Sequence, residues 1–437
     1  MNKYYLKCVQ CGYETPDFKT WFGQNQICPK CKSKHSEVWY DADYKSIEEL
    51  IKSCPDSFWH YWDFLPLVDK KNIVSCREGA IPIEEWPFLN EYARQKYGLN
   101  IQVFVCRNDL NGGTGTFKDV AASLAASLFK ENEVSQYSVA STGNTATAYA
   151  FYLSLAGVDT SIFIPNNALK ASEAMISAYG QQVFRVNGDY AEAKVIAAEY
   201  AKKYGILLSS GNIDPIRVEA KKTMVFEWMR LLKGMPDVYI QAVSGGTGPI
   251  AIDKGLRELS PLYPELKMPR MLLVQPDQCD PMVQAWEQAV GDGFPDGFEK
   301  SYPVIKNPAT AIPTLATGEP ATYPILAKLV RKSNGAFLRM CEEKLADYGK
   351  LVAFEQKIIL GPASAVCIAG FFESLKNGLI KEGERVLLNA GEGVRRAPDF
   401  VDQMVYTTKH VDSIDGCQPH CISDYREQLW KAVERFR

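Results

Sequence analysis

Residues 111–119, Asn-Gly-Gly-Thr-Gly-Thr-Phe-Lys-Asp, form a glycine-rich turn between an apolar β-rich run at residues 101–106 and a helical pattern at residues 118–131. A strand followed by such a turn and a helix is the building unit of a parallel α/β sheet. The turn delivers Lys118 to a helix N-terminus, where the helix dipole and burial beside Phe117 both disfavour an ammonium charge. Lys118 can therefore become a neutral amine, the form that attacks a carbonyl carbon to give a Schiff base. Taken alone, Lys118 is better interpreted as a solvated residue in the first turn of a helix.

Two further glycine-rich turns follow predicted strands. Residues 141–145 read Ser-Thr-Gly-Asn-Thr and residues 244–248 read Ser-Gly-Gly-Thr-Gly, and each precedes a helical pattern. Such turns at helix N-termini bind anions, so the first suits a carboxylate and the second a phosphate. A single turn of this kind is often an ordinary connection between a strand and a helix. Three of them in this order, one carrying a lysine, favour a shared site.

The chain from about residue 99 alternates β-rich runs with helical patterns. The predicted strands are residues 101–106, 136–141, 159–165, 181–187, 238–243, 270–275 and 385–390. The predicted helices are residues 118–131, 145–157, 169–180, 189–205, 221–234 and 364–378. This alternation predicts an α/β fold with parallel-rich sheets and ligand sites at the carboxyl ends of the strands.

The length and composition limit which classes of protein the chain can belong to. A length of 437 residues predicts two or three domains. The net charge of -3, from 49 basic and 52 acidic side chains, lacks the basic surplus of proteins that bind nucleic acids or anionic membranes, so neither partner is expected. The chain shows no export signal and no apolar run long enough to span a bilayer. We therefore expect a cytoplasmic protein with reduced thiols.

Four of the 12 cysteines stand in two Cys-x-x-Cys pairs, Cys8 with Cys11 and Cys28 with Cys31, separated by 16 residues. This spacing is typical of a zinc ribbon, and four sulfur ligands define a structural metal site. The alternative is a degenerate ribbon that has lost its metal. Buried packing is expected for Cys54, Cys76, Cys106, Cys279, Cys341 and Cys367. Cys417, His420 and Cys421 are close in sequence but have no complementary cluster of ligands.

The order of the motifs resembles a known family. The motifs are TGTFKD at 114–119, STGNTA at 141–146, SGGTG at 244–248, ILGPASAV at 359–366 and NAGEG at 389–393. They resemble the threonine synthase family of fold type II pyridoxal-phosphate enzymes, over roughly residues 59–400. The cysteate synthase branch is also similar around residues 240–248 and 386–394. The resemblance implies a tryptophan synthase β-like fold of two α/β lobes with parallel-rich sheets, preceded by a zinc ribbon.

The resemblance also implies domain boundaries and residue roles. Residues 1–44 would form the ribbon, 45–115 with 215–400 the large cofactor-binding domain, 116–214 the small substrate domain and 401–437 a C-terminal extension. Lys118 would carry pyridoxal 5'-phosphate covalently and move protons at the substrate carbons. Asn144 would bind the cofactor's 3-hydroxyl, and Arg217 the substrate's leaving phosphate. The cofactor phosphate would be held by Ser244, Gly245, Gly246, Thr247 and Gly248. The substrate's carboxylate or phosphate would be held by Ser141, Thr142, Gly143 and Thr145.

Two positions depart from the family pattern. Ala390 stands where threonine synthases usually present a hydroxyl to the pyridine nitrogen, so Asn389, a neighbouring side chain or water would take that place. Asp214 stands near Arg217, where an acidic group beside a phosphate is unfavourable unless it points away or pairs with a base. These departures leave the leaving group and the partner of the pyridine nitrogen open.

The resemblance implies two reactions that share Lys118 and the cofactor. A threonine synthase converts O-phosphohomoserine and water to L-threonine and phosphate. A cysteate synthase converts O-phosphoserine and sulfite to L-cysteate and phosphate. We favour the first slightly, because residues 114–125 are closer to that group, and the altered turns at 211–214 and 389–393 lean toward the second. A non-catalytic interaction protein is the alternative of another class. Family members are commonly homodimers. A C-terminal helix is expected to dock on the body, and the alternatives are that it packs on the ribbon or on a second subunit, or covers the site.

Overall fold

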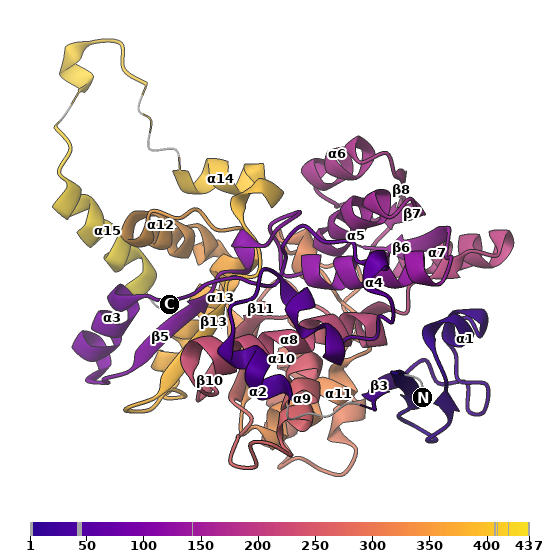
Figure 1. Ribbon diagram of the computed structural model, residues 1–437. Helices are drawn as coiled ribbons and strands as arrows, with labels where there is room; N and C mark the ends of the chain where they lie inside the picture. The colour runs from indigo at the N-terminus through magenta and orange to yellow at the C-terminus, as the bar shows by residue number, and fades with distance from the viewer. Residues whose placement is uncertain are drawn as a thin grey trace.

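The computed structural model describes residues 3–41, 46–141, 143–405, 408, 410–417 and 419–435. Two α/β lobes and a small N-terminal β-unit make up the molecule (Figure 1). Within the described part of the chain, no helix is both long and apolar enough to cross a membrane. The predicted fold class, with two lobes and parallel-rich sheets, is confirmed.

The larger lobe is built on a six-stranded sheet. Its strands, in spatial order, are β12 (Ala336–Met340), β11 (Arg270–Pro276), β10 (Val238–Ala242), β13 (Arg385–Asn389), β5 (Gln102–Cys106) and β4 (Ile83–Glu85). All neighbours are parallel except β4, which pairs antiparallel with β5 at the edge. The inner strands are almost wholly buried, as expected for a parallel sheet covered by helices on both faces.

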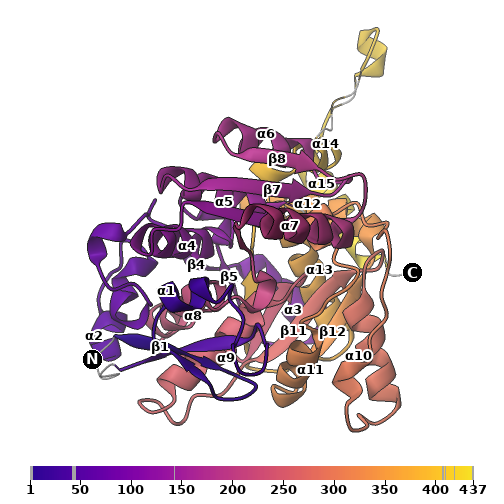
Figure 2. The ribbon, with the colours of Figure 1, turned by 90° about the vertical axis from the view of Figure 1, so that its right-hand side faces the viewer.

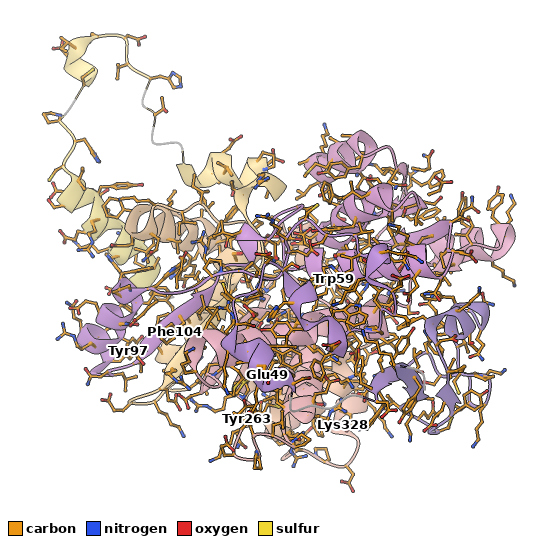
Figure 3. All side chains as sticks on the ribbon, viewed as in Figure 1. Glu49, Trp59, Tyr97, Phe104, Tyr263 and Lys328 are labelled. Carbon is orange, nitrogen blue, oxygen red and sulfur yellow. The ribbon has the colours of Figure 1, made fainter. Side chains whose placement is uncertain are left out.

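The smaller lobe is a four-stranded parallel sheet formed by one continuous stretch of chain. Its spatial order is β8 (Gln182–Arg185), β7 (Asp159–Ile164), β6 (Gln136–Ala140) and β9 (Leu207–Leu208). The helices of this lobe are α4 (Asp119–Glu131), α5 (Asn144–Leu155), α6 (Lys170–Ala178) and α7 (Tyr190–Tyr204). Figure 2 shows this lobe above the larger one. Trp59, labelled in Figure 3, packs on it by donating to the buried Ser123 hydroxyl of α4 at 2.9 Å.

Helices cover both faces of the large sheet. They are α3 (Pro87–Tyr97), α8 (Pro215–Leu232), α9 (Thr247–Leu259), α10 (Pro281–Gly291), α11 (Tyr323–Lys332), α12 (Leu345–Gln356) and α13 (Pro362–Lys376). Each of the seven predicted strands is present. Helix α8 begins six residues earlier than predicted, because the carboxylate of Asp214 caps it by accepting from the Ile216 backbone N–H at 2.9 Å. Pro215 then supplies the fixed backbone angle that suits a first helical position.

The N-terminal unit pairs its strands antiparallel in the order β2 (Glu14–Thr15), β1 (Tyr4–Cys8) and β3 (Ser36–Tyr40). Helix α1 (Phe18–Gly23) follows β2, and α2 (Ser46–Lys52) leads into the body. The unit docks on the larger lobe through buried polar contacts. Tyr40 donates its hydroxyl to Glu219 of α8, and Lys254 of α9 donates to the Val38 carbonyl.

The C-terminal helices pack on the body. Helix α14 is Pro398–Val405, and α15 (Ile422–Glu434) packs against α12 and lies beside α3 in Figure 1. Leu429 and Val433 of α15 enter the core of the larger lobe, and Trp430 stacks on Tyr92 with ring centroids 5.0 Å apart. Of the expected alternatives, docking of the helix on the body is therefore confirmed.

The scattered cysteines divide into two groups. Cys106, Cys279 and Cys367 are buried as predicted, and Cys76 is partly buried. The expectation of burial was wrong for Cys54 and Cys341, which are exposed. Both lie just beyond the end of a regular element, α2 and β12 respectively, where the apolar neighbours in sequence turn inward and the thiol faces solvent.

Candidate active site

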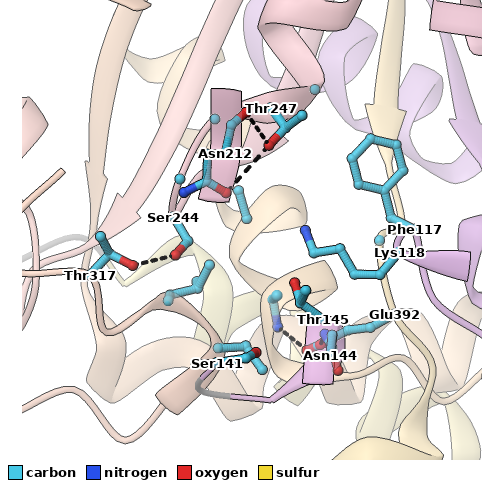
Figure 4. Close-up of a pocket in the computed structure, with 18 of the residues that line it drawn as sticks. Phe117, Lys118, Ser141, Asn144, Thr145, Asn212, Ser244, Thr247, Thr317 and Glu392 are labelled. Carbon is cyan, nitrogen blue, oxygen red and sulfur yellow. Dashed lines mark hydrogen bonds between the residues drawn. The ribbon is translucent and has the colours of Figure 1, made fainter. Parts of the chain in front are cut away.

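The three glycine-rich turns all line one cavity between the two lobes (Figure 4). It encloses about 920 Å³ of space free of protein atoms, including its open mouth, which is the size of a small-molecule site. The predicted residues in its wall are Lys118, Ser141, Asn144, Thr145, Arg217, Ser244, Gly245, Gly246, Thr247, Gly248 and Asn389. Gly143 lies next to the wall, at the N-terminus of α5. Thr142 lies outside the described residues.

The lysine turn is held rigidly from behind by a buried carboxylate. Asp119 accepts from the Thr114 backbone N–H at 3.0 Å, the Thr114 hydroxyl at 2.6 Å and the Thr116 backbone N–H at 2.8 Å. The turn also needs left-handed backbone at Gly113 and Gly115, with φ of 82° and 70°, which glycine adopts without strain. Lys118 is thereby fixed at the N-terminal end of α4 with its side chain extended into the cavity (Figure 4).

The Lys118 amine has a low pKa. Its pKa is lowered to about 8, first by burial and then by the positive charge of Arg217, while the carboxylate of Glu392 acts in the opposite direction. At about pH 7 roughly a tenth of the amine is therefore neutral, far more than for an exposed lysine. The structure thus agrees with the expected direction of this shift and gives the lysine the character of a nucleophile and a base.

The turn at 141–145 opens α5 and faces the lysine. The Ser141 hydroxyl accepts from the backbone N–H groups of Gly143 at 3.3 Å and Ala146 at 3.1 Å, so its oxygen completes the helix N-terminus. Asn144 donates its amide to the carboxylate of Glu392. The Oδ1 atom of Asn144 is buried and has no hydrogen-bond partner among the described residues. A buried acceptor without a partner is costly, so Asn144 points to a ligand with a donor at this place.

The turn at 244–248 lies between β10 and α9. A Cβ atom on Gly245 would stand 1.8 Å from the Asn212 amide nitrogen, so only glycine lets Asn212 close on this turn. The Thr247 hydroxyl donates to the Asn212 carbonyl at 3.0 Å, and the Ser244 and Thr317 hydroxyls lie 2.6 Å apart (Figure 4). The first backbone N–H groups of α9 have no partner within the helix, which makes this turn a receptor for an anion.

Arg217 stands in the first turn of α8 and is 7% exposed. Its guanidinium donates to the Ser209 hydroxyl at 2.9 Å and to the Tyr149 hydroxyl at 3.2 Å. Asp214 points into its own helix as the cap of α8, and burial raises the pKa of its carboxyl. Because Asp214 does not pair with the guanidinium, Arg217 keeps donor capacity for an anionic ligand.

The segment 389–393 closes the site and adds a residue that the sequence did not assign. The side-chain Oδ1 atom of Asn389 accepts from the side-chain amide of Asn108 at 2.7 Å, so the Asn389 amide is already oriented. Glu392 is 1% exposed and accepts from the Ala363 backbone N–H at 2.7 Å as well as from Asn144. Other wall residues missed by sequence reasoning are Tyr190, Asn212, Gln241, Thr314, Leu315 and Thr317. Asn212 and Gln241 stand in the segments 211–214 and 240–248 noted for the resemblance but had no assigned role, and the other four have no local motif that marks them.

The predicted metal-binding cysteines converge in the N-terminal unit. The sulfur atoms of Cys8, Cys11, Cys28 and Cys31 all lie within 4.8 Å of one another, and the Cys8 to Cys31 distance is 3.5 Å. A tetrahedral zinc with bonds of about 2.3 Å separates its sulfurs by about 3.8 Å. No other group of three or more possible ligands comes together in the ranges that the structure describes.

A buried lysine facing two helix N-termini between two α/β lobes is the arrangement expected of an enzyme that works through an amine nucleophile. The chain belongs to the pyridoxal-phosphate dependent enzyme family, whose model matches residues 74–391. It is 28% identical over 398 residues to threonine synthase of Methanocaldococcus jannaschii, covering 89% of this chain and 92% of that protein. It is 27% identical to threonine synthase of Methanosarcina acetivorans, covering 88% and 90%.

Solved structures agree on the fold. Maize serine racemase matches with a TM-score of 0.60 at 18% identity, covering 84% of this chain and 97% of that chain. Diaminopropionate ammonia lyase from Escherichia coli matches with a TM-score of 0.61 at 16% identity, covering 82% and 92%. The protein is therefore a pyridoxal-phosphate dependent enzyme on a fold shared by several activities.

The residues present fit pyridoxal phosphate. The low pKa of Lys118 suits covalent capture of an aldehyde, and the unpartnered Oδ1 of Asn144 suits a hydroxyl on the ring. The turn at 244–248 offers the helix N-terminus that a phosphate needs. Lys118, Asn144 and this turn are therefore the residues that would hold the cofactor.

The pKa of Lys118 predicts how the enzyme without cofactor captures pyridoxal phosphate. Only the neutral amine reacts, so the capture rate should fall about tenfold for each pH unit below the pKa of about 8 and level off above it. The carboxylate of Glu392 raises the pKa of Lys118. Its removal in Glu392→Gln should therefore lower that pKa and move the pH profile of the capture rate to lower pH. Stopped-flow absorbance measures the rate. A flat profile, or a shift to higher pH in the variant, would contradict the assignment.

Proposed function

We propose that the enzyme releases phosphate from an O-phosphorylated amino acid, in the manner of a threonine synthase: O-phosphohomoserine and water give L-threonine and phosphate. The observation that carries the proposal is that Lys118 faces two separate anion sites in one cavity. The turn at 244–248 takes the cofactor phosphate, which leaves Arg217 and the turn at 141–145 for a substrate that carries a carboxylate and a phosphate. The similarity to threonine synthases over most of both chains supports the same reading.

The chain's own residues have distinct roles in this proposal. When bound, the cofactor supplies an electron sink for the pair left by proton loss at the substrate's Cα. Lys118 takes that proton with its Nζ atom and returns a proton to a neighbouring carbon. Arg217 holds the leaving phosphate with its free guanidinium donors, and Ser141 and Thr145 orient the carboxylate. Glu392 fixes the Asn144 amide, so that Oδ1 is presented to the ring.

A second candidate is a replacement reaction of the cysteate synthase type, in which O-phosphoserine and sulfite give L-cysteate and phosphate. Residues 389–393 favour it, because Ala390 offers no hydroxyl where threonine synthases usually have one, and Asn389 lies in the wall instead. Both candidates use the same lysine and the same phosphate site. They differ in the length of the substrate and in the incoming nucleophile.

A substrate panel separates the two candidates. The wild-type holoenzyme is given O-phosphohomoserine alone, O-phosphoserine alone, and O-phosphoserine with sulfite, and released phosphate and amino-acid products are measured. We expect phosphate and L-threonine from O-phosphohomoserine. L-cysteate from O-phosphoserine and sulfite, with no L-threonine from O-phosphohomoserine, would replace the first candidate by the second. No phosphate from any mixture would contradict both. Lys118→Ala serves as the blank.

We also propose that the four N-terminal cysteines hold one structural zinc ion. Their sulfur spacing and the lack of an open position support this reading. The proposed domains are the ribbon at 1–44, the large domain at 45–115 with 215–400, the small domain at 116–214 and the extension at 401–437. The two main sheets, which use strands from separate parts of the chain, support the division of the body.

A further inference from the structure

The N-terminal unit contacts the smaller lobe by aromatic packing of Phe22 on Phe129 of α4, and also through a buried glutamine, Gln26. Gln26 is 3% exposed. Its amide nitrogen donates to the Leu208 carbonyl at 2.6 Å, and its amide oxygen accepts from the Ser210 hydroxyl at 2.6 Å. The Gln26 side chain therefore bonds to Leu208 and Ser210, the two residues that flank Ser209, although both are more than 180 positions away in sequence.

Among the described residues, Ser209 is one of the two side chains that accept from the Arg217 guanidinium, and Tyr149 is the other. The Ser209 hydroxyl accepts from the guanidinium at 2.9 Å and from the Gly211 backbone N–H at 3.3 Å. The strand before it, β9, has only two residues and pairs with β6 alone at the edge of its sheet. The sheet holds Ser209 itself by one further bond, from its N–H to the Ser138 carbonyl at 2.9 Å. Because so short an edge strand is weakly held, the two hydrogen bonds that the Gln26 side chain makes, one as donor and one as acceptor, help to fix the segment where Arg217 needs a partner.

The backbone of Gln26 is itself held by the ribbon. Gln26 has a φ of 58°, an uncommon value for a residue other than glycine, which persists only where the surroundings fix it. Its N–H donates to the carbonyl of the buried Trp21 at 3.0 Å. Cys28, a predicted metal ligand, follows two residues later. The cysteine cluster, Gln26 and the segment 208–210 thus form a continuous connection to Arg217.

We propose that Gln26 is a positioning residue for Arg217, so that the ribbon helps to set the enzyme's affinity for phosphate. This inference rests on the proposed function, in which Arg217 binds the leaving phosphate. Gln26 suits the role because a primary amide supplies one donor and one acceptor in fixed geometry. Glutamate has the same shape but no donor, and its charge would face the Leu208 carbonyl.

The test is the affinity of the holoenzyme for inorganic phosphate, measured by calorimetry. With the cofactor bound, the turn at 244–248 is taken, so added phosphate reports on the substrate's phosphate site. We expect Gln26→Ala to weaken phosphate binding about 3- to 10-fold, from the loss of two hydrogen bonds in the support of Arg217. Gln26→Glu should weaken it at least as much. Gln288→Ala, at an exposed glutamine on α10, is the matched control and should bind as the wild type does.

A double-mutant cycle with Arg217→Ala distinguishes positioning from general loosening. If Gln26 acts through Arg217, Gln26→Ala causes little further loss of phosphate affinity in the Arg217→Ala background. Equal losses in both backgrounds, or unchanged affinity in Gln26→Ala, would overturn the inference. Metal content and cofactor absorbance should stay at wild-type levels in Gln26→Ala. If the Arg217→Ala holoenzyme binds phosphate as tightly as the wild type, the proposed role of Arg217 is overturned, and the inference with it.

Discussion

Replacing Lys118 with alanine should abolish the visible absorbance of the bound cofactor and lower turnover by about 10⁴-fold or more. The variant loses both the covalent attachment and the base that moves the Cα proton. The turn itself should survive, because Asp119 holds it through the backbone of Thr114 and Thr116 without using the lysine. Absorbance after incubation with pyridoxal phosphate, steady-state phosphate release and thermal unfolding measure the three effects.

Lys221→Met is the matched control for Lys118→Ala. Lys221 is also buried, and its Nζ lies 4.6 Å from the ring centroid of Phe117, the neighbour of Lys118. Burial lowers the pKa of Lys221, and the charges of Lys118 and Arg217 lower it further, so Lys221 is a second buried amine near the site that could react. Lys221 does not line the cavity, so Lys221→Met should keep the cofactor absorbance. Wild-type turnover in Lys118→Ala would refute the assignment of the catalytic lysine.

Removal of the metal should have the second large effect. In Cys28→Ser we expect loss of the single zinc ion that we propose for each wild-type chain, followed by unfolding of the ribbon, because structural zinc contributes on the order of 10 kcal/mol to folding in small zinc domains. The unfolded ribbon should be cut by trypsin before the body is. Elemental analysis and limited proteolysis measure both effects. Because Gln26 belongs to the ribbon, phosphate affinity should fall at the same time.

Cys54→Ser controls for the loss of a thiol, because Cys54 is exposed and lies outside the cysteine cluster. It should keep the metal and resist trypsin as the wild type does. A wild-type protein that contains no metal, yet resists proteolysis throughout its first 40 residues or so, would contradict the zinc assignment. That outcome would instead indicate that packing of the buried aromatic residues is enough to fold the ribbon without metal; these residues are Tyr4, Phe18 and Trp21.

The sequence predicted the parts of the site that are local in the chain. Each glycine-rich turn has a signature of a few residues, because glycine, a hydroxyl or lysine and the start of a helix must occur together to present a group at a helix N-terminus. The two cysteine pairs are equally local, since a two-residue spacing alone brings both thiolates to one ion. The sequence alone therefore predicts that Lys118 and residues 244–248 stand at helix N-termini, and the structure places both in the wall of one cavity.

The parts that the sequence could not predict depend on long-range packing. Glu392 meets Asn144 across 248 positions, and Gln26 meets Leu208 across 182, and neither pair has a local pattern. Thr317 enters the cavity from a long irregular loop that carries no helical or strand period. Long-range packing also explains why burial of Cys54 was predicted wrongly. The apolar residues near it in sequence turn away from it in space, so the thiol is exposed.

Peptide mapping after borohydride reduction tests the central claim most directly. Reduction makes a lysine-linked cofactor permanent, and proteolysis with mass spectrometry then identifies the modified residue. We predict that pyridoxal phosphate is attached to Lys118, in a peptide spanning the turn at 111–119. Attachment to Lys221, or no attached cofactor in a protein saturated with pyridoxal phosphate, would contradict the site.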